Sequence, residues 1–285
     1  MRVVIGVDWS DQAFAAVTQT FQLCHPTDVT LVHGIELGIL EHPFMAQAGN
    51  VQGYDDFRKA MVDSGHQLLE RAAAMIPPEV ASIRKVSEIG SPAQLILDSA
   101  ENLAADLIVV GVRGRSRLSE MVLGSVSHRV LLHGSRPTLI VRGAARKVQR
   151  VLIAIEERND ADRIVKWLTE HPLADPVELR VVHAVVPIGV IEPYVGPEIS
   201  AWLEDVQHYA EELVQSTAGK LLNPRYTVST KVAQGNPAAV IEQEAKDMDL
   251  VVVTSHGRKG ISRFLLGSVS HAVVHHVSCP ILVLR

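Results

Sequence analysis

The residues best suited to chemistry form a glycine-rich segment with fixed spacing, Gly111-x2-Gly114-x9-Gly124-Ser125. Glycines let the backbone come close to a bulky ligand because they carry no side chain. A helix that begins at Gly124-Ser125 would present N–H groups and a positive dipole to a phosphate. Ser125 and Ser127 add hydroxyl groups, and arginines lie between the glycines. The segment predicts a phosphate-binding site.

A second candidate, Asp8, follows the first apolar run of the chain. Its carboxylate could accept a hydrogen bond from a ribose hydroxyl, or it could cap the helix that follows. Taken singly, a Gly-x-x-Gly loop is more often a tight turn, and Ser125 is more often a helix cap. Only the combined spacing, after a strand and before a helix, indicates nucleotide binding.

The sequence contains an internal duplication. The block Gly124–His128 returns as Gly267–His271, and the apolar run that starts at Asp106 returns at Asp249 with the same offset of 143 residues. This period is too long for a solenoid unit. We therefore expect two domains of one kind, comprising residues 1–145 and 146–285.

Each half alternates β-rich runs with helical patterns, which predicts parallel strands joined by helical crossovers. The strands expected in the first half are Val3–Val7, Val29–His33, Ser82–Ser87, Leu107–Val110 and Thr138–Val141. The helices expected there are Gln12–Leu23, Tyr54–Met75, Ala93–Leu103 and Val126–Leu132.

The second half repeats this pattern. Its expected strands are Val151–Ile155, Glu178–His183, Thr227–Val232, Leu250–Val253 and Ile281–Leu284. Its expected helices are Ala161–Thr169, Ala201–Leu221, Ala238–Lys246 and Val269–His275. The fold class is therefore α/β, with two tandem, doubly wound, open five-stranded parallel sheets. Such sheets bind ligands beyond the carboxyl ends of the strands, here between the first and fourth strands of each half.

Local signals mark element ends. Ser91-Pro92 and Asn236-Pro237 predict an N-cap followed by proline at the start of the third helix in each half. Residues 36–53 and 187–199 have few periodic apolar positions, so we expect loops there.

Composition excludes several classes of protein. A formal charge of −5 and a pI near 6.2 give no attraction to nucleic acid or anionic membranes. No apolar run approaches the roughly 20 residues that span a bilayer. The amino terminus lacks the apolar region of a signal peptide. We expect a cytoplasmic protein.

Catalytic and metal-binding motifs are missing from the sequence. It has neither a Gly-x-Ser-x-Gly nucleophile elbow nor a Walker lysine, so we assign no catalytic residue. His271 and His275 have the i, i+4 spacing of zinc ligands, but no Glu follows His271 as in a zinc protease. We read them as part of a surface helix. His33 and His183 end equivalent strands and are expected to be structural or to lie beside a bound base.

The chain resembles the universal stress protein family in its tandem, two-domain form. The resemblance rests on the glycine signature, Val-Asp-Trp-Ser at 7–10, Val-His at 32–33 and 182–183, and a proline before each last strand. It implies an adenine nucleotide alpha hydrolase-like sheet with strand order 3-2-1-4-5, and ATP, with Mg²⁺, as the ligand. The site residues it implies in the first half are Asp8, Val32, Gly111, Gly114, Arg115, Gly124, Ser125, Val126 and Ser127.

The second half departs from that pattern. Thr254 replaces the first signature glycine, and Glu156 replaces the aspartate. A weaker nucleotide site and a purely structural domain both remain open. The candidate residues there are Glu156, Val182, Gly257, Gly267, Ser268, Val269 and Ser270.

The resemblance implies a non-catalytic regulatory or protective protein of the stress response that binds ATP. A slow ATPase on the same fold and a nucleotide-free interaction scaffold are the alternatives. We also expect Thr138–Val141 and Ile281–Leu284 to meet about a pseudo-two-fold axis, because each would otherwise leave an apolar sheet edge unprotected. This makes the chain an internal pseudo-dimer, and two chains are expected to pair into a homodimer.

Overall fold

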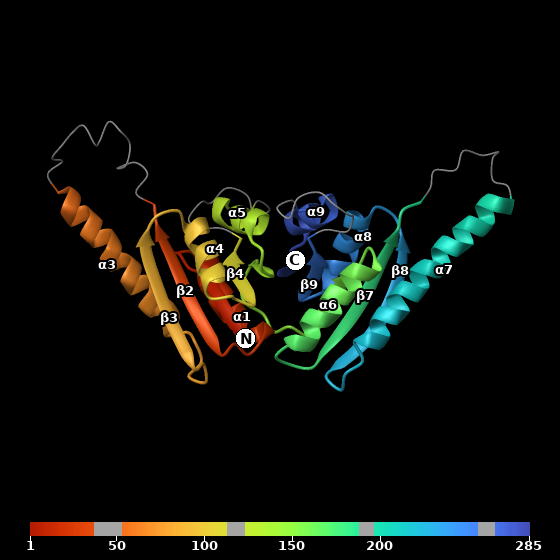
Figure 1. The fold of residues 1–285 in the computed structure, drawn as a ribbon, viewed down its shortest axis with the longest axis horizontal. Coiled ribbons are helices and arrows are strands. Elements are labelled where there is room, and N and C mark those ends of the chain that lie inside the picture. Colours follow the sequence, from red (N-terminus) through yellow and green to blue (C-terminus); the bar gives the residue numbers. More distant parts are fainter. Residues whose placement is uncertain (37–52, 113–122, 188–196, 256–265) are drawn as a thin grey trace, which may run out of the picture. The chain divides into compact units, whose positions relative to one another are not determined.

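A computed structural model describes residues 1–36, 53–112, 123–187, 197–255 and 266–285. The chain forms two compact units, one comprising most of Met1–Ala145 and the other Arg146–Arg285 (Figure 1). Each unit is a parallel sheet with helices packed on it. The predicted α/β class and its tandem arrangement are confirmed.

The sheet of the first unit has the strand order β3-β2-β1-β4-β5, with parallel pairing throughout, as predicted. Its strands are β1 (Arg2–Gly6), β2 (Asp28–Ile35), β3 (Ser82–Ile89), β4 (Leu107–Gly111) and β5 (Thr138–Val141). Its helices are α1 (Asp11–Leu23), α3 (Tyr54–Ala73), α4 (Pro92–Asn102) and α5 (Ser125–His133).

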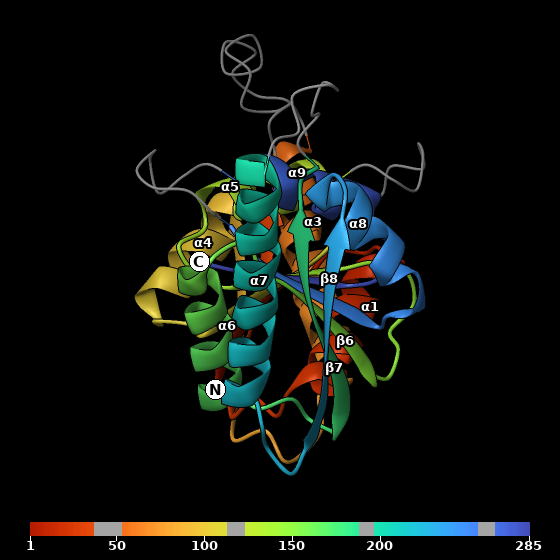
Figure 2. The same cartoon turned by 90° about the vertical axis from the view of Figure 1, so that its right-hand side faces the viewer.

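The second unit repeats this order as β8-β7-β6-β9-β10. Its strands are β6 (Arg150–Ala154), β7 (Val177–Val185), β8 (Tyr226–Gln234), β9 (Leu250–Thr254) and β10 (Ile281–Leu284). Its helices are α6 (Arg158–Glu170), α7 (Pro197–Lys220), α8 (Pro237–Glu244) and α9 (Ser268–His276), with a 3₁₀ turn at Ala245–Asp247. In Figure 2, α6 and α7 lie on one side of β7 and β8, and α8 lies on the other.

The core of each unit lies on its central strands. Val3–Ile5 of β1 and Leu107–Val109 of β4 are fully buried, because helices cover both faces of a parallel sheet. The edge strand β3 instead exposes charged side chains such as Arg84 and Lys85. Charges on an edge strand discourage pairing with another chain.

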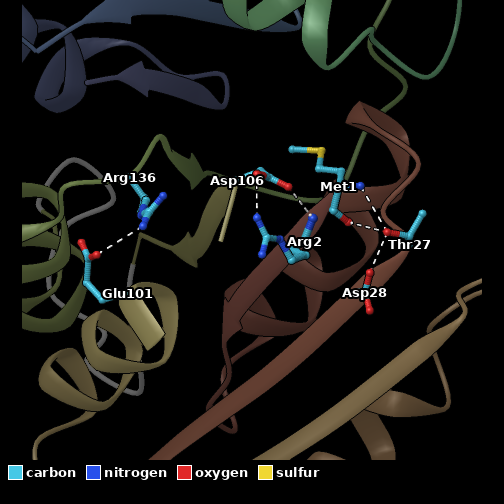
Figure 3. Close-up of polar contacts among 7 residues, drawn as sticks. All are labelled: Met1, Arg2, Thr27, Asp28, Glu101, Asp106 and Arg136. Carbon is cyan, nitrogen blue, oxygen red and sulfur yellow. Dashed lines mark hydrogen bonds and ion pairs between the residues drawn. The ribbon is translucent and has the colours of Figure 1, made fainter. Parts of the chain in front are cut away.

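The duplicated aspartates fasten the amino ends of the central strands. Asp106 accepts a hydrogen bond of 2.7 Å from the backbone N–H of Arg2, and its carboxylate lies 3.8 Å from the Arg2 guanidinium (Figure 3). Asp249 accepts bonds from the backbone N–H groups of Gln149 and Arg150 at 3.0 and 2.8 Å. Both aspartates precede the strand whose carboxyl end carries the predicted site, so their role is structural.

Both predicted helix starts are confirmed in position, and they differ in whether the cap side chain forms a hydrogen bond. Asn236 caps α8, since its side-chain oxygen accepts from the N–H groups of Ala238 and Ala239 at 3.0 and 3.3 Å. Ser91 is likewise at the N-cap of α4 and Pro92 at its first position, as predicted, but the Ser91 side chain makes no capping hydrogen bond.

Two further expectations concern the loops and membranes. The predicted loop at 36–53 lies mostly outside the described residues, as does that at 187–199. The second loop was drawn too long, because α7 begins at Pro197. Among the helices that the structure describes, none is long and apolar enough to cross a membrane.

Candidate functional site

A cavity of about 410 Å³ opens in the first unit at the carboxyl ends of β1, β2 and β4. The sequence predicted a ligand site here, between the first and fourth strands, where the strand order reverses. The cavity brings together every predicted first-half site residue that the structure describes. These are Asp8, Val32, Gly111, Gly124, Ser125, Val126 and Ser127. Gly114 and Arg115 lie outside the described residues.

The amino terminus of α5 lines this cavity. Gly124 is extended, with φ −67° and ψ 160°, and it has no side chain with which to cap the helix. The first N–H groups of an α-helix have no partner within the helix, and they attract anions. The turn at Ser125 therefore offers backbone donors to a ligand.

Ser127 fastens this turn to the sheet. Its hydroxyl donates to the carbonyl oxygen of Val112 at 2.9 Å and lies 3.1 Å from that of Gly124. The Gly124 N–H also donates to Val112, at 2.6 Å. Because a hydroxyl has one proton and that of Ser127 is used within the protein, this side chain holds the helix terminus in place, and the backbone N–H groups at the start of α5 are the donors that face the cavity.

Asp8 does not cap α1 itself but holds Ser10, the residue that does. Its Oδ1 accepts from the backbone N–H of Ser10 at 2.9 Å and from the Ser10 hydroxyl. The Ser10 oxygen in turn accepts from the N–H of Ala13 at 3.2 Å, within the first turn of α1. Neither of these Asp8 bonds involves Oδ2, so holding Ser10 leaves a ribose contact geometrically open.

The two histidines at the strand ends have matching partners. The Nδ1 atom of His33 lies 2.9 Å from the carbonyl oxygen of Val7, and that of His183 lies 3.0 Å from the oxygen of Ile155. Both rings thus join neighbouring strand ends beside the cavities. This agrees with the structural role expected for them.

The second unit has a cavity of about 600 Å³ at the equivalent place. It contains all the predicted second-half residues except Gly257, which lies outside the described part of the chain. Those present are Glu156, Val182, Gly267, Ser268, Val269 and Ser270. The hydroxyl of Ser270 lies 3.3 Å from the carbonyl oxygens of Ser255 and Gly267, much as Ser127 is placed.

The model of the universal stress protein family matches the chain twice, over residues 1–142 and 147–285. The chain belongs to the universal stress protein family. Two similar relatives are universal stress proteins of Mycolicibacterium smegmatis and Mycobacterium tuberculosis. Each is 28% identical and covers 99% of this chain and 96% of its own length.

Solved structures agree in fold. A universal stress protein from Archaeoglobus fulgidus covers 100% of this chain and 96% of its own, with a TM-score of 0.64 and 19% identity. One from Pseudomonas aeruginosa covers 99% of this chain and 92% of its own, with a TM-score of 0.61 and 15% identity. These likenesses extend over both units.

Two glycines of the first cavity wall are required by close packing, Gly111, which the sequence analysis named, and Gly34, which it missed. A Cβ atom on Gly34 would lie 2.5 Å from the Cα of Pro92, and one on Gly111 would lie 2.8 Å from the carbonyl oxygen of Gln12. Real Cβ atoms do not come this close to backbone, so only glycine permits this packing. Gly34 sits inside an apolar strand, and that position was the available signal.

The main residue that was missed in the second unit is Asp160, which is only 1% exposed. Its Oδ1 accepts from the Thr254 hydroxyl at 2.7 Å, and its Oδ2 lies 3.3 Å from the backbone nitrogens of Glu156 and Glu157. Burial raises the pKa of the Asp160 carboxyl above its ordinary value of 3.8, against the opposing effect of these hydrogen bonds. Thr254 is thus committed to an internal bond.

The paired histidines on α9 were the one metal-like feature of the sequence. The rings of His271 and His275 lie 4.5 Å apart between centroids, with a tilt of 40°. Within the described ranges, no group of three or more His, Cys, Asp or Glu side chains could hold a metal ion.

Proposed function

We propose that the first unit binds ATP together with Mg²⁺, and that the protein is a non-catalytic regulatory or protective factor of the stress response. The observation that carries the proposal is the amino terminus of α5, which lines a cavity together with Asp8 and Gly111. Backbone N–H groups at such a terminus bind phosphate well.

The chemistry of the cavity wall fits an adenine nucleotide. Apolar side chains such as Val32, Ile35 and Ile96 suit a flat base, while Asp8 suits a sugar hydroxyl and α5 suits phosphate. Its volume of about 410 Å³ lies within the roughly 300–1,000 Å³ of small-molecule sites. Mg²⁺ would neutralise part of the phosphate charge.

We propose that the first unit is the principal ATP site. In the second unit, Thr254 stands at the position of Gly111, so a side chain occupies the space beside the strand end. Glu156 is one methylene longer than Asp8 and reaches further. Both changes alter the wall that a sugar would face, and the Thr254 hydroxyl donates to Asp160 at 2.7 Å.

Two rival functions are a slow ATPase and a scaffold that binds no nucleotide. An enzyme needs a group that activates water and donors that stabilise developing charge. We assign no described residue to either role. Turnover is therefore expected far below the ~1–10³ s⁻¹ of typical enzymes.

Mass spectrometry of the small molecule released by denaturing freshly purified protein tests the proposal. We expect an adenine nucleotide at about one per chain, or its uptake when ATP is added. Protein that neither retains nor takes up nucleotide would favour the scaffold. ATP turnover above about 1 s⁻¹ that is lost in Gly114→Glu would favour the enzyme.

A further inference from the structure

The apolar stripe of α7 continues beyond the part of this helix that packs on the sheet. Leu213 and Val214 are each 2% exposed, because this half of the helix covers β7 and β8. Earlier positions of the same stripe, at helical spacings of three or four residues, are less covered. Val206 is partly buried, Leu203 is 36% exposed and Trp202 is 48% exposed. In Figures 1 and 2, the first turns of α7 extend beyond the ends of β7 and β8, so the sheet leaves them uncovered.

The equivalent helix of the first unit, α3, shows which features the fold does not require. The buried positions of the two helices match at a constant offset of 145 residues, as Leu68 and Leu213 do. At this offset, α7 is apolar at two positions where α3 is not, with Leu203 for Arg58 and Tyr209 for Ser64. Tyr209 is 45% exposed. The fold therefore does not need an apolar surface here.

Acidic side chains flank the apolar surface of α7. The helix contains no lysine or arginine before its last residue. Asp205, which is exposed, follows Trp202 by three residues, a spacing that makes two side chains neighbours on a helix. Glu212 follows Tyr209 in the same way. It lies 3.5 Å from Nε2 of His208 but is still 60% exposed, so both carboxylates are open to a partner.

The helix α3 lacks these acidic residues at the equivalent positions, and it mixes both signs of charge along its length. At three exposed positions, it has uncharged or basic residues where α7 is acidic, namely Lys59 for Glu204, Ala60 for Asp205 and Gln67 for Glu212. Exposed side chains contribute little to folding. The combination of apolar and acidic side chains on α7 is therefore not a demand of the fold, and a binding role accounts for it.

The charge of this surface determines which partner fits it. A second copy of α7 would bring two acidic surfaces together, and like charges across an interface oppose binding. An anionic membrane or a nucleic acid would be repelled for the same reason. A helix with an apolar stripe flanked by lysine or arginine complements both features, since amphipathic helices bind apolar surfaces through residues spaced by three or four. Tryptophan and tyrosine are among the residues that contribute most at protein interfaces.

We propose that the amino-terminal half of α7 is a docking surface for a basic amphipathic helix of a partner protein. The apolar contacts of this surface are Trp202, Leu203, Val206 and Tyr209, and its ionic contacts are Asp205 and Glu212. Val206 and Tyr209 also line the second cavity, so the bound helix lies at the mouth of that cavity. The inference goes beyond the proposed ATP site and does not depend on it.

Fluorescence anisotropy of the full-length protein with a fluorescein-labelled peptide tests this. The probe is an amphipathic helix of leucine and lysine, about 20 residues long so that a helix can form. We expect saturable binding with one site per chain at physiological salt. The same peptide with glutamate in place of lysine should bind about tenfold more weakly, because the carboxylates repel it. A shuffled leucine and lysine peptide without an apolar face should be weakened similarly.

Two double variants test the two kinds of contact. Trp202→Ser with Tyr209→Ser removes both rings and should weaken binding of the lysine peptide about tenfold. Asp205→Lys with Glu212→Lys reverses the charge, so it should weaken the lysine peptide and strengthen the glutamate peptide. The matched control is Phe57→Ser, because Phe57 is the counterpart of Trp202 on α3 and is equally exposed, at 48%. This control should leave the affinity unchanged. Circular dichroism checks that each variant is folded.

Four results would overturn the proposal. The shuffled peptide could bind as tightly as the amphipathic one, which would mean attraction to the net charge of −5 alone. Phe57→Ser could weaken binding as much as the α7 variants do. The parent protein could fail to bind the lysine peptide, which would mean that its own chain or a second copy covers the surface. Finally, a folded Asp205→Lys, Glu212→Lys protein could keep the parent's preference for the lysine peptide.

Discussion

At the residue scale, Gly111 and Gln12 form a close contact that the second unit replaces with Thr254 and Asp160. We predict that Gly111→Thr destabilises the protein by about 1–3 kcal/mol, because its Cβ would meet the Gln12 backbone. Adding Gln12→Asp should recover part of this loss by supplying the acceptor that Thr254 has. Urea unfolding of the single and double variants measures the coupling. Strictly additive effects would show that the pair does not act together.

The buried carboxyl of Asp160 makes stability depend on pH. Its pKa in the folded protein is raised above the ordinary 3.8, chiefly by burial, so folding favours the protonated form. The stability gained from protonated Asp160 is fully present below the pKa of this group in the unfolded chain, and it is lost as pH rises through its pKa in the folded protein. Relative to Asp160→Asn, the parent should therefore gain stability as pH falls toward 4.

Urea unfolding of the parent and Asp160→Asn over a pH series checks this prediction. The asparagine variant lacks the titrating group, so the difference between the two unfolding free energies isolates Asp160. The prediction is wrong if this difference does not change with pH, or if the parent loses stability relative to Asp160→Asn as pH falls. Either result would mean that burial does not raise the pKa of the Asp160 carboxyl.

The part of the candidate site that could be predicted from the sequence is the part whose residues lie close together along the chain. The signature from Gly111 to Ser127 is a local pattern, and its described members do line one cavity. Asp160 was not foreseen, because its partner Thr254 is 94 residues away. Gly34 was missed for the same reason, since the demand for glycine comes from Pro92 on a later helix.

At the element scale, α4 and α8 begin with the same dipeptide pattern but differ in their caps. Asn236 accepts two backbone N–H groups, whereas Ser91 accepts none. Asn236→Ala should therefore cost about 1 kcal/mol of unfolding free energy. Ser91→Ala, the matched control, should stay within about 0.5 kcal/mol. Equal losses in chemical denaturation would contradict the assignment of the caps.

Element positions were predicted best where apolar runs are bounded sharply. The last strands, Thr138–Val141 and Ile281–Leu284, were placed to the residue, because a proline precedes each. The start of α6 was placed three residues late, at Ala161. A capping box between Glu157 and Asp160 extends the helix to Arg158, and that box is not of the usual serine or threonine type.

At the scale of the whole molecule, the pairing of Thr138–Val141 with Ile281–Leu284 about a pseudo-two-fold axis stays a prediction. Val283→Lys places a charge in the middle of the last strand, where the side chain is buried. We expect the two units to loosen, which X-ray scattering would detect as a larger radius of gyration. A variant as compact and as heat-stable as the parent would refute the pairing.

The central claim is that ATP binds at the amino terminus of α5 in the first unit, and calorimetric titration of two matched variants tests it most directly. Ser125→Glu places a negative charge where phosphate would sit, and glutamate in a first helical turn is otherwise favourable to folding. Ser268→Glu makes the same change at the start of α9. We predict that ATP binding is lost in Ser125→Glu and retained in Ser268→Glu. Unchanged ATP affinity in a folded Ser125→Glu protein would contradict the account.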